Sequence, residues 1–340
     1  MKKIKIEDAV GMVLGHDVTQ IIPGKFKGPR FRRGYMIRQE DIPDFLKIGK
    51  EHVYVMDLKA GVVHEDNAAV RLGKAFSGEN IDLTGPSEGK VTFHSKIKGI
   101  LKIHLSLLHR INLSGNIILS TLHRYIPCTP GMAVGATRII SLTAPERQIE
   151  KVENWCEKYG PIIGILPYRV LNIGVVVTGN EFFHGRTEDR FDDRVGKKIS
   201  NLGSHVVKKK VVADEIHRIA QALIELQNEN VDLILVTGGL SVDPDDVTRA
   251  GVKKAGTRII FYGTPILPGA MFLYGMLGKK PVLGLPACVF HHNATLFDLV
   301  FPRILAGETL KRREINLLGH GGYCRNCDPC HYPVCPFGKG

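Results

Sequence analysis

Residues 237–241 form a short segment whose composition suits the binding of a phosphate. The segment reads Thr-Gly-Gly-Leu-Ser and follows directly on the apolar run Leu233–Val236. Glycines let backbone N–H groups approach a phosphate closely, and the hydroxyls of Thr237 and Ser241 add hydrogen-bond donors. A turn that only needs a positive φ has the same composition. The residues that follow favour the phosphate loop.

Acidic residues come directly after this loop. Asp243, Asp245 and Asp246 surround Pro244 and precede a predicted helix. Carboxylates beside a phosphate are favourable when Mg²⁺ bridges the two. One of them, Asp245 or Asp246, is enough to cap the following helix, so three acids exceed what a cap requires. The segment therefore favours a phosphate site that includes a divalent cation.

A second loop of the same kind begins at Thr178. Residues 178–181 read Thr-Gly-Asn-Glu and follow the apolar run Ile173–Val177. A glutamate at the C-terminal end of a strand, here Glu181, is a candidate metal ligand or general base. The alternative is an exposed loop acid without a role in chemistry.

The apolar runs before these loops predict buried parallel strands. The runs Ile173–Val177, Leu233–Val236 and Pro281–Leu285 are continuous, as in strands covered on both faces. Apolar residues recur at helical spacing from Ile216 to Leu226, and we expect Asp214 to cap that helix. This alternation predicts an α/β domain with helices on both faces of a parallel sheet. Ligands of such sheets bind beyond the C-terminal ends of the strands, where the loops lie.

Four of the seven cysteines lie close together near the end of the chain. Cys324, Cys327, Cys330 and Cys335 have the spacing Cys-x2-Cys-x2-Cys-x4-Cys and are followed by Pro336. Without a secretion signal, such spacing favours a metal over disulfides. It is close to the bacterial ferredoxin run, with one extra residue. Zn²⁺ also suits four thiolates, although zinc usually pairs two separated Cys-x2-Cys knuckles. We expect a [4Fe–4S] cluster or Zn²⁺ to organise this short tail.

The composition is that of a globular protein with a basic surface. The 340 residues include 46 Lys and Arg against 34 Asp and Glu, a formal net charge of +12. That balance favours anionic partners, but the basic residues are scattered and no interleaved basic and aromatic RNA-binding motif occurs. No apolar run is long enough to span a membrane, and the N-terminal residues do not form a secretory signal. We expect a cytoplasmic protein with neither membrane nor nucleic acid as partner.

The length predicts roughly two domains. A helix signal begins at Ala144-Pro145-Glu146 and ends at Gly160, near which we place the boundary. We predict a mixed α+β N-terminal domain at residues 1–160, an α/β domain at 161–312 and a Cys-rich metal-binding tail at 313–340.

The order of these motifs resembles the molybdopterin-binding domains of molybdenum insertase (molybdopterin molybdenumtransferase), molybdopterin adenylyltransferase and gephyrin. The resemblance covers about residues 170–308, and it rests on the loops at Thr178 and Thr237, the turn Pro268-Gly269 and the run Gly284-Leu285-Pro286. It implies a three-layer α/β sandwich with a mostly parallel sheet. Residues 34–55 resemble more weakly the segment that precedes the pterin domain of the insertase, and the insertase implies a homodimer.

The resemblance implies a protein of molybdenum-cofactor biosynthesis. Its ligand would be molybdopterin or the adenylylated form, a small pterin that carries a phosphate. As an insertase-like transferase it would use molybdate to displace AMP, with Mg²⁺ present. Glu181, Asp214 and Asp246 are then the catalytic candidates. The candidates for cofactor binding are Thr178, Gly179, Thr237, Gly238, Gly239, Ser241, Asp243, Pro268, Gly269, Gly284, Leu285 and Pro286.

Departures from the family pattern leave other activities open. Residues 244–248 match the adenylyltransferase pattern, whereas 238–242 match the insertase pattern. Ala270 stands where the insertase has a lysine, and Ala287 stands where it has a glycine. The alternatives are a molybdopterin adenylyltransferase and a non-catalytic cofactor carrier or sensor. Insertases do not ordinarily carry the cysteine tail, which implies docking to a molybdoenzyme or another protein of the cofactor pathway, electron transfer or redox sensing.

Overall fold

The structure, a computed structural model, describes residues 1–56, 60–241, 243 and 246–340. These residues form two compact units. Unit 1 comprises residues within 1–96, 103–122 and 130–164, and unit 2 comprises 97–102, 123–129 and 165–340. Two short segments of unit 2, residues 97–102 and 123–129, therefore lie between segments of unit 1 along the chain. The three-part division predicted from the sequence stays a prediction.

The first part of unit 1 is a small strand-rich region with its own core. Its elements are β1 (Lys2–Lys5), η1 (Ile6–Ala9), β2 (Val18–Ile22), β3 (Phe26–Phe31), η2 (Gln39–Asp41), α1 (Ile42–Lys47) and β4 (His52–Val55). Strand β1 pairs with β4 and β2 pairs with β3, both antiparallel. Phe31 and Phe45 stack at the centre of the core, with ring centroids 4.0 Å apart.

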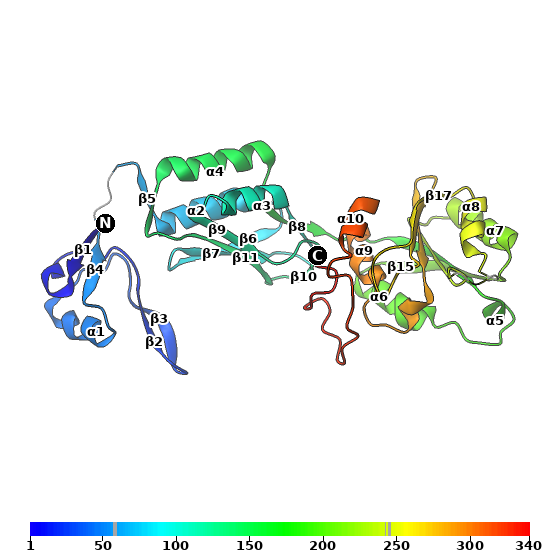
Figure 1. Cartoon of the computed structure of the whole chain (residues 1–340), viewed down its shortest axis with the longest axis horizontal. Coiled ribbons are helices and arrows are strands. Elements are labelled where there is room, and N and C mark those ends of the chain that lie inside the picture. Colours follow the sequence, from blue (N-terminus) through cyan, green and yellow to red (C-terminus); the bar gives the residue numbers. More distant parts are fainter. Residues whose placement is uncertain (57–59, 242, 244–245) are drawn as a thin grey trace. The chain divides into compact units, whose positions relative to one another are not determined.

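The rest of unit 1 is a four-stranded antiparallel sheet that carries helices. Its elements are β5 (Val62–His64), α2 (Glu65–Phe76), β6 (Ile81–Ser87), β7 (Lys90–Ser95), α3 (Leu105–Asn112), β9 (Ile117–Thr121), β11 (Ala133–Ile139), β12 (Thr143–Pro145) and α4 (Glu146–Tyr159). The strand order is β6-β7-β11-β9. Helix α2 packs on the sheet and α4 packs against α2 (Figure 1). As predicted, α4 starts after Pro145 and ends at Gly160.

A three-stranded sheet of order β10-β8-β13, most of whose residues belong to unit 2, is formed by β8 (Gly99–Ile103), β10 (Pro127–Cys128) and β13 (Ile163–Pro167). The main part of unit 2 contains β14 (Asn172–Thr178), α5 (Asn180–Phe183), η3 (Asp192–Gly196), α6 (Lys197–Asn201), β15 (His205–Val212), α7 (Ile216–Asn228), β16 (Leu233–Thr237) and α8 (Thr248–Lys254). It continues with β17 (Arg258–Tyr262), β18 (Leu273–Leu277), β19 (Lys280–Leu285), η4 (Ala287–Phe290), α9 (Leu296–Leu305) and α10 (Arg312–Leu317).

The main sheet of unit 2 has six strands in the order β15-β14-β16-β19-β18-β17. The first four are parallel to one another, and β18 and β17 are antiparallel additions at one edge. The three strands predicted from apolar runs are β14, β16 and β19, which lie side by side at the centre. The sequence-based prediction of a mostly parallel α/β sheet is therefore confirmed.

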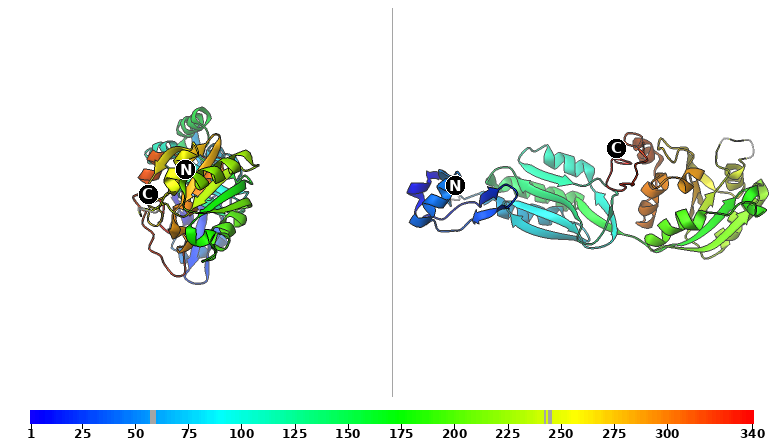
Figure 2. Two further views of the ribbon diagram at one scale, coloured as in Figure 1. Left: turned by 90° about the vertical axis from the view of Figure 1, so that its right-hand side faces the viewer. Right: turned by 90° about the horizontal axis from the view of Figure 1, so that it is seen from below.

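Side chains alternate between two apolar clusters on opposite faces of this sheet. Val175 and Val177 of β14 join the cluster that includes α6, α9 and α10, whereas Val176 joins the cluster that includes α7 and α8. Helices cover the sheet of unit 2 in both views of Figure 2. This burial on both faces explains why the central strands are continuously apolar. Within the described residues, no helix is long and apolar enough to cross a membrane.

Candidate functional site

A cavity of about 500 Å³ lies at the C-terminal ends of β14 and β16. This volume is typical of a site for a small-molecule ligand. Its lining comes from the ends of β14 and β16, from α5 and η4, from the loops after β15 and β16, and from the segment before η3. The lining residues are Val177, Thr178, Gly179, Glu181, Phe182, Thr187, Glu188, Asp189, Arg190, Asp214, Thr237, Gly238, Gly239, Asp246, Ala287, Phe290 and His291.

Gly238 and Gly239 bring the loop after β16 close to the loop after β14. Both have positive φ, +93° and +54°. A Cβ at Gly238 would lie 2.1 Å from the carbonyl oxygen of Thr178, and one at Gly239 would lie 2.7 Å from Oγ1 of Thr248. Only glycine fits this approach, because backbone cannot yield as the end of a flexible side chain does. The two glycines therefore form a tight cradle at the cavity wall.

Buried hydroxyl groups hold this cradle in place. The Oγ1 atoms of Thr178 and Thr248 are 2.9 Å apart, and the backbone N–H of Thr248 donates to the carbonyl of Gly239 at 3.2 Å. Both threonines are buried. Thr237 is also buried, but its Oγ1 has no hydrogen-bond partner in the described structure. A buried hydroxyl without a partner is uncommon in folded proteins, and this one belongs to a residue that lines the cavity, so it is available to a ligand there.

Asp214 is held at the cavity by Asn180, which is a correction to the sequence prediction. The backbone N–H of Asn180 donates to Oδ2 of Asp214 at 3.0 Å, and the backbone N–H of Asp214 donates to Oδ1 of Asn180 at 3.3 Å. The N-cap of α7 is Glu215 and has no side-chain capping bond. Asp214 therefore does not cap α7 as predicted. Its Oδ1 is buried and lacks a partner in the described structure.

Asp246 also lines the cavity and does not cap the following helix. The N-cap of α8 is Val247, again without a side-chain capping bond. The backbone N–H of Asp246 donates to the carbonyl of Asp243 at 3.0 Å. Val242, Pro244 and Asp245, which the sequence analysis included in this loop, lie outside the described residues.

Eight of the predicted site residues line the cavity together. They are Thr178, Gly179, Glu181, Asp214, Thr237, Gly238, Gly239 and Asp246. The lining does not include seven others among the described residues, namely Ser241, Asp243, Pro268, Gly269, Gly284, Leu285 and Pro286. Gly284 and Leu285 are buried within β19, and a Cβ at Gly269 would lie 2.7 Å from Cβ of Leu296 in α9. These two glycines thus permit close packing within unit 2.

Sequence reasoning missed several lining residues between 182 and 190 and at the end of η4. Phe182 and Phe290 add aromatic rings, and Arg190 and His291 add nitrogen donors. Asp189 is fixed by Lys209, whose Nζ lies 3.0 Å from it. Burial lowers the pKa of Lys209, but hydrogen bonds to Asp192 and Asp189 outweigh it and raise the pKa overall. No motif at residues 182–190 marks them as part of a binding site. The only available clue was that they follow the Thr178 loop closely along the chain.

The four cysteines of the tail line a second cavity in unit 2, of about 380 Å³. Each is half-buried, and none forms a disulfide. Within the described ranges, no group of three or more His, Cys, Asp or Glu side chains is arranged to hold a metal ion.

Comparison with known proteins shows what part of unit 2 is similar to. Residues 174–306 match the family model described as a probable molybdopterin binding domain, and residues 3–57 match a domain of unknown function. The resemblance inferred from the sequence is thereby confirmed for this region. Molybdopterin molybdenumtransferase of Haemophilus influenzae is 30% identical over 144 residues, which are 40% of this chain and 35% of that protein. A CinA-like protein of Thermotoga neapolitana is 34% identical over 84 residues, 25% of this chain and 20% of that protein.

The matched segments thus span about a third or less of the length of these two curated relatives. Among solved structures, the molybdopterin biosynthesis enzyme MoaB of Thermus thermophilus covers 42% of this chain with a TM-score of 0.33 and 19% identity, over 100% of its own length. The molybdopterin biosynthesis MoeA protein of Pyrococcus horikosii covers 90% of this chain and 74% of its own, with a TM-score of 0.33 and 14% identity.

Proposed function

We propose that unit 2 binds adenylylated molybdopterin and inserts molybdenum into it, with release of AMP. The observation that supports this most strongly is the convergence of a glycine cradle and three carboxylates on one cavity. Glu181 of α5, Asp214 of the loop after β15 and Asp246 of the loop after β16 are distant along the chain, yet all line the same cavity as Gly238 and Gly239. Such a wall suits a phosphate ester whose charge a cation shares.

The phosphate end of the ligand would lie at the Thr237 loop. Backbone N–H groups beside glycine can approach a phosphate closely, and the unpartnered Oγ1 of Thr237 supplies a hydroxyl donor. The hydroxyl pair of Thr178 and Thr248 links the end of β14 to the start of α8, on either side of the glycine loop. The cradle is therefore preformed, so little ordering of the chain opposes binding.

The three carboxylates fit the coordination chemistry of Mg²⁺. This ion usually takes one or two carboxylates and completes its shell with water and substrate phosphates. The buried, unpartnered Oδ1 of Asp214 is a donor of this kind, and Glu181 and Asp246 are the other candidates. When bound, Mg²⁺ would neutralise charge on the phosphate groups. The role of the protein is to hold these carboxylates in place, as the hydrogen bonds of Asn180 do for Asp214.

Two aromatic residues in the lining suit the pterin. Phe182 and Phe290 offer flat apolar surface, and Arg190 and His291 offer hydrogen-bond donors to its polar edge. This pairing of rings and a few polar groups is typical of small-molecule sites.

The finer fold and assembly stay part of this proposal. We infer a three-layer sandwich for residues 161–312, a mixed α+β domain before it at 1–160, a tail at 313–340 and a homodimer. We also infer that the tail docks to a molybdoenzyme or another protein of the cofactor pathway. The relatedness of residues 174–306 to molybdopterin-binding domains supports the first of these.

A single-turnover assay tests the proposed activity. Molybdate-dependent release of AMP from adenylylated molybdopterin supports it. Formation of that adenylylated form from ATP and molybdopterin would assign the protein to the adenylyltransferases. Tight binding of the pterin with neither reaction would assign it to the carriers or sensors, a role that Ala287 in the cavity wall favours.

A further inference from the structure

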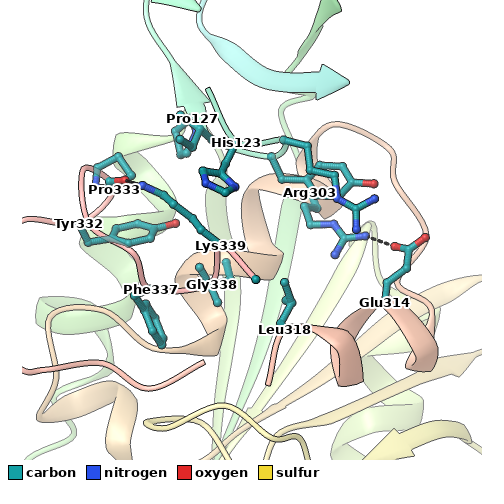
Figure 3. A pocket seen from close by; sticks show the side chains of 15 residues that line it. His123, Pro127, Arg303, Glu314, Leu318, Tyr332, Pro333, Phe337, Gly338 and Lys339 are labelled. Carbon is teal, nitrogen blue, oxygen red and sulfur yellow. Dashed lines mark hydrogen bonds and ion pairs between the residues drawn. The ribbon is translucent and has the colours of Figure 1, made fainter. Parts of the chain in front are cut away.

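We propose that a small pocket around Arg303 in unit 2 binds a tetrahedral oxyanion with two negative charges, of the class of phosphate, sulfate and molybdate. The pocket has a volume of about 40 Å³, and we call it the Arg303 pocket (Figure 3). Its lining comes from α9, from α10 and its C-terminal cap, and from the segments 123–127, 332–333 and 337–340. Among the described residues, none lines both this pocket and the cavity at the ends of β14 and β16. The proposal therefore does not depend on the function inferred for that cavity.

Arg303 carries a buried guanidinium group whose hydrogen bonding is incomplete. Its side chain is 3% exposed, and its Nη2 pairs with Glu314 of α10. Its Nε is buried and has no hydrogen-bond partner in the described structure. A buried donor without a partner is uncommon and costly, above all on a charged group. Arg303 therefore has a donor available to a ligand in the pocket that it lines.

The ring of Tyr125 holds two guanidinium groups close together. Cζ of Arg303 lies 4.0 Å from the ring centroid, and Cζ of Arg124 lies 5.3 Å from it. The hydroxyl of Tyr125 donates to Oε2 of Glu308 at 3.2 Å, which fixes the ring. Glu308 is itself paired with Lys102, so it does not neutralise the two arginines. An anion in the pocket would offset the repulsion between them.

The side chains that line the pocket carry more positive than negative charge. Among the described residues of the lining, Arg124, Arg303 and Lys339 are cationic, and Glu314 is the one carboxylate. Three cations against one carboxylate leave an excess of two positive charges when His123 is neutral. In the view of Figure 3, His123 and Lys339 lie on one side of Arg303 and Glu314 lies on the other. A ligand with two negative charges balances this excess.

Lys339 supplies further donors. Its Nζ donates to the carbonyl of Pro333 at 2.6 Å, and an ammonium group has two more N–H groups to offer. Burial lowers the pKa of Lys339, while the charge of Cys335 acts in the opposite direction. A bound anion favours the charged form of a nearby amine. Binding of the anion and protonation of Lys339 therefore support each other.

The size of the pocket limits the ligand to a small ion. A cavity needs roughly 10–15 Å³ to hold one water molecule, so the Arg303 pocket, at about 40 Å³, has room for a few waters or one inorganic oxyanion. It is far smaller than the cavity of about 500 Å³ at the ends of β14 and β16. Guanidinium groups present planar donors that match the oxygen atoms of phosphate and similar anions. Size, donors and charge together define the class of ligand.

Isothermal titration calorimetry of the full chain with sulfate, phosphate and molybdate, at constant ionic strength, tests the proposal. The expected result is one saturable site per chain for at least one of the three dianions, with a Kd below about 1 mM. Perchlorate has the same shape and a single charge, and it should bind at least about tenfold more weakly. A preference for molybdate would connect the pocket with the proposed reaction, and a preference for sulfate or phosphate would make it a separate anion site. Either preference supports the proposal.

Matched variants locate the site. Arg124→Gln and Lys339→Met each remove one cation of the lining and should weaken binding about tenfold, the usual effect of losing a hydrogen bond to a charged group. The control Arg313→Gln removes the same charge from an exposed residue outside the lining. It should stay within about twofold of the wild type, because solvent and salt screen exposed charges. Thr237→Val should leave the affinity unchanged, which distinguishes this site from the glycine loop of the larger cavity.

Arg303→Lys tests the unpartnered donor itself, because lysine keeps the charge that faces Glu314 but has no Nε. It should weaken binding by about tenfold or more. Circular dichroism shows whether each variant is folded, and the variants of the half-buried Arg124 and Lys339 carry the test where Arg303→Lys is unfolded.

Four results would each overturn the proposal. They are the absence of saturable binding for all three dianions, perchlorate binding as tight as theirs, undiminished binding by a folded double variant Arg124→Gln with Lys339→Met, and an equal loss of affinity in Arg313→Gln. None of these results decides whether AMP is released, so this proposal and the proposed function fail separately.

Discussion

Asn180 and Asp214 hold each other through two reciprocal hydrogen bonds, of 3.0 and 3.3 Å, between the first residue of α5 and the loop after β15. The pair uses one carboxylate oxygen of Asp214 and leaves the other, Oδ1, buried without a partner. Asn180 thereby positions the carboxylate of Asp214 and leaves one of its oxygens able to bind a ligand or cation. This arrangement predicts a role for Asp214 that depends on its charge more than on its shape.

We expect Asp214→Asn to fold normally and to lose activity. An amide can keep the bond to the backbone of Asn180, but it removes the negative charge. Release of AMP should fall about 100-fold, the usual loss when one electrostatic contact to a reacting group is removed. The matched control is Glu215→Gln, because Glu215 is the next residue and its 43% exposed side chain pairs with Arg218. The control should stay within about threefold of the wild type, since exposed ion pairs contribute little. An active Asp214→Asn would remove this residue from the site.

The unpartnered hydroxyl of Thr237 predicts a variant that gains stability and loses affinity. Thr237→Val should leave the free energy of unfolding unchanged or raise it by up to about 1 kcal/mol, because it removes a buried group without a hydrogen bond. Molybdopterin binding should weaken about fivefold, the cost of one neutral hydrogen bond.

Thr257→Val is the control for this prediction. Thr257 is also buried with an unpartnered Oγ1, but it does not line the cavity. Denaturant unfolding should show the same change in both variants, and titration with the pterin should separate them. Equal affinities would show that Thr237 does not contact the ligand.

Gly238→Ala should disrupt the glycine cradle. The added Cβ would lie 2.1 Å from the carbonyl oxygen of Thr178, in addition to the cost of φ at +93°. We expect a loss of more than about 2 kcal/mol in the free energy of unfolding, together with loss of pterin binding. Gly203→Ala has a similar φ of +87° but no atom within 4 Å of the added Cβ, and it should cost only about 1 kcal/mol. If denaturant unfolding shows equal losses of unfolding free energy for both variants, then the backbone at Thr178 shifts to accommodate the added Cβ at little cost.

His64 predicts a pH dependence of stability in unit 1. It is 1% exposed, its Nε2–H donates to the carbonyl of Gly15 at 2.8 Å, and its Nδ1 accepts the N–H of Asp66 at 3.2 Å. These bonds require the neutral ring. Burial, followed by the charge of Arg33, lowers the pKa of His64 below 6.5, while Asp66 acts in the opposite direction.

Below about pH 6.5 the unfolded chain therefore takes up a proton at His64 that the folded chain does not. The stabilisation is complete above this pH and is lost as the pH falls through the lowered pKa, at up to about 1.4 kcal/mol per pH unit. His64→Gln should flatten this part of the curve of unfolding free energy against pH. An unchanged slope would assign the effect to another group, such as His16, whose pKa burial also lowers.

The sequence predicted the elements that depend on local pattern. Continuous apolar runs identified β14, β16 and β19, and a parallel sheet brings the loops after them to one edge. The sequence predicted Asp214 as a helix cap because its true partner, Asn180, begins α5, 34 residues earlier, and is not apparent from local spacing. The packing of Gly269 against Leu296 is likewise a contact that no local spacing reveals.

For the cysteine tail, too, the sequence indicates the local pattern but not the contacts with distant segments. Its spacing identified the four cysteines as a set, because the intervals are a local pattern. Its support by Leu267 and by the carbonyl of Asp298 comes from segments distant along the chain. Only the folded structure shows that the set surrounds a single cavity.

The most direct test of the account is a single-turnover reaction of the anaerobically purified chain with adenylylated molybdopterin, Mg²⁺ and molybdate, in which AMP is measured against time. The account predicts a molybdate-dependent release of about one AMP per chain, which separates chemistry from later steps, and its loss in Asp214→Asn but not in Glu215→Gln. Tight binding of adenylylated molybdopterin with no release of AMP at any molybdate concentration would contradict it.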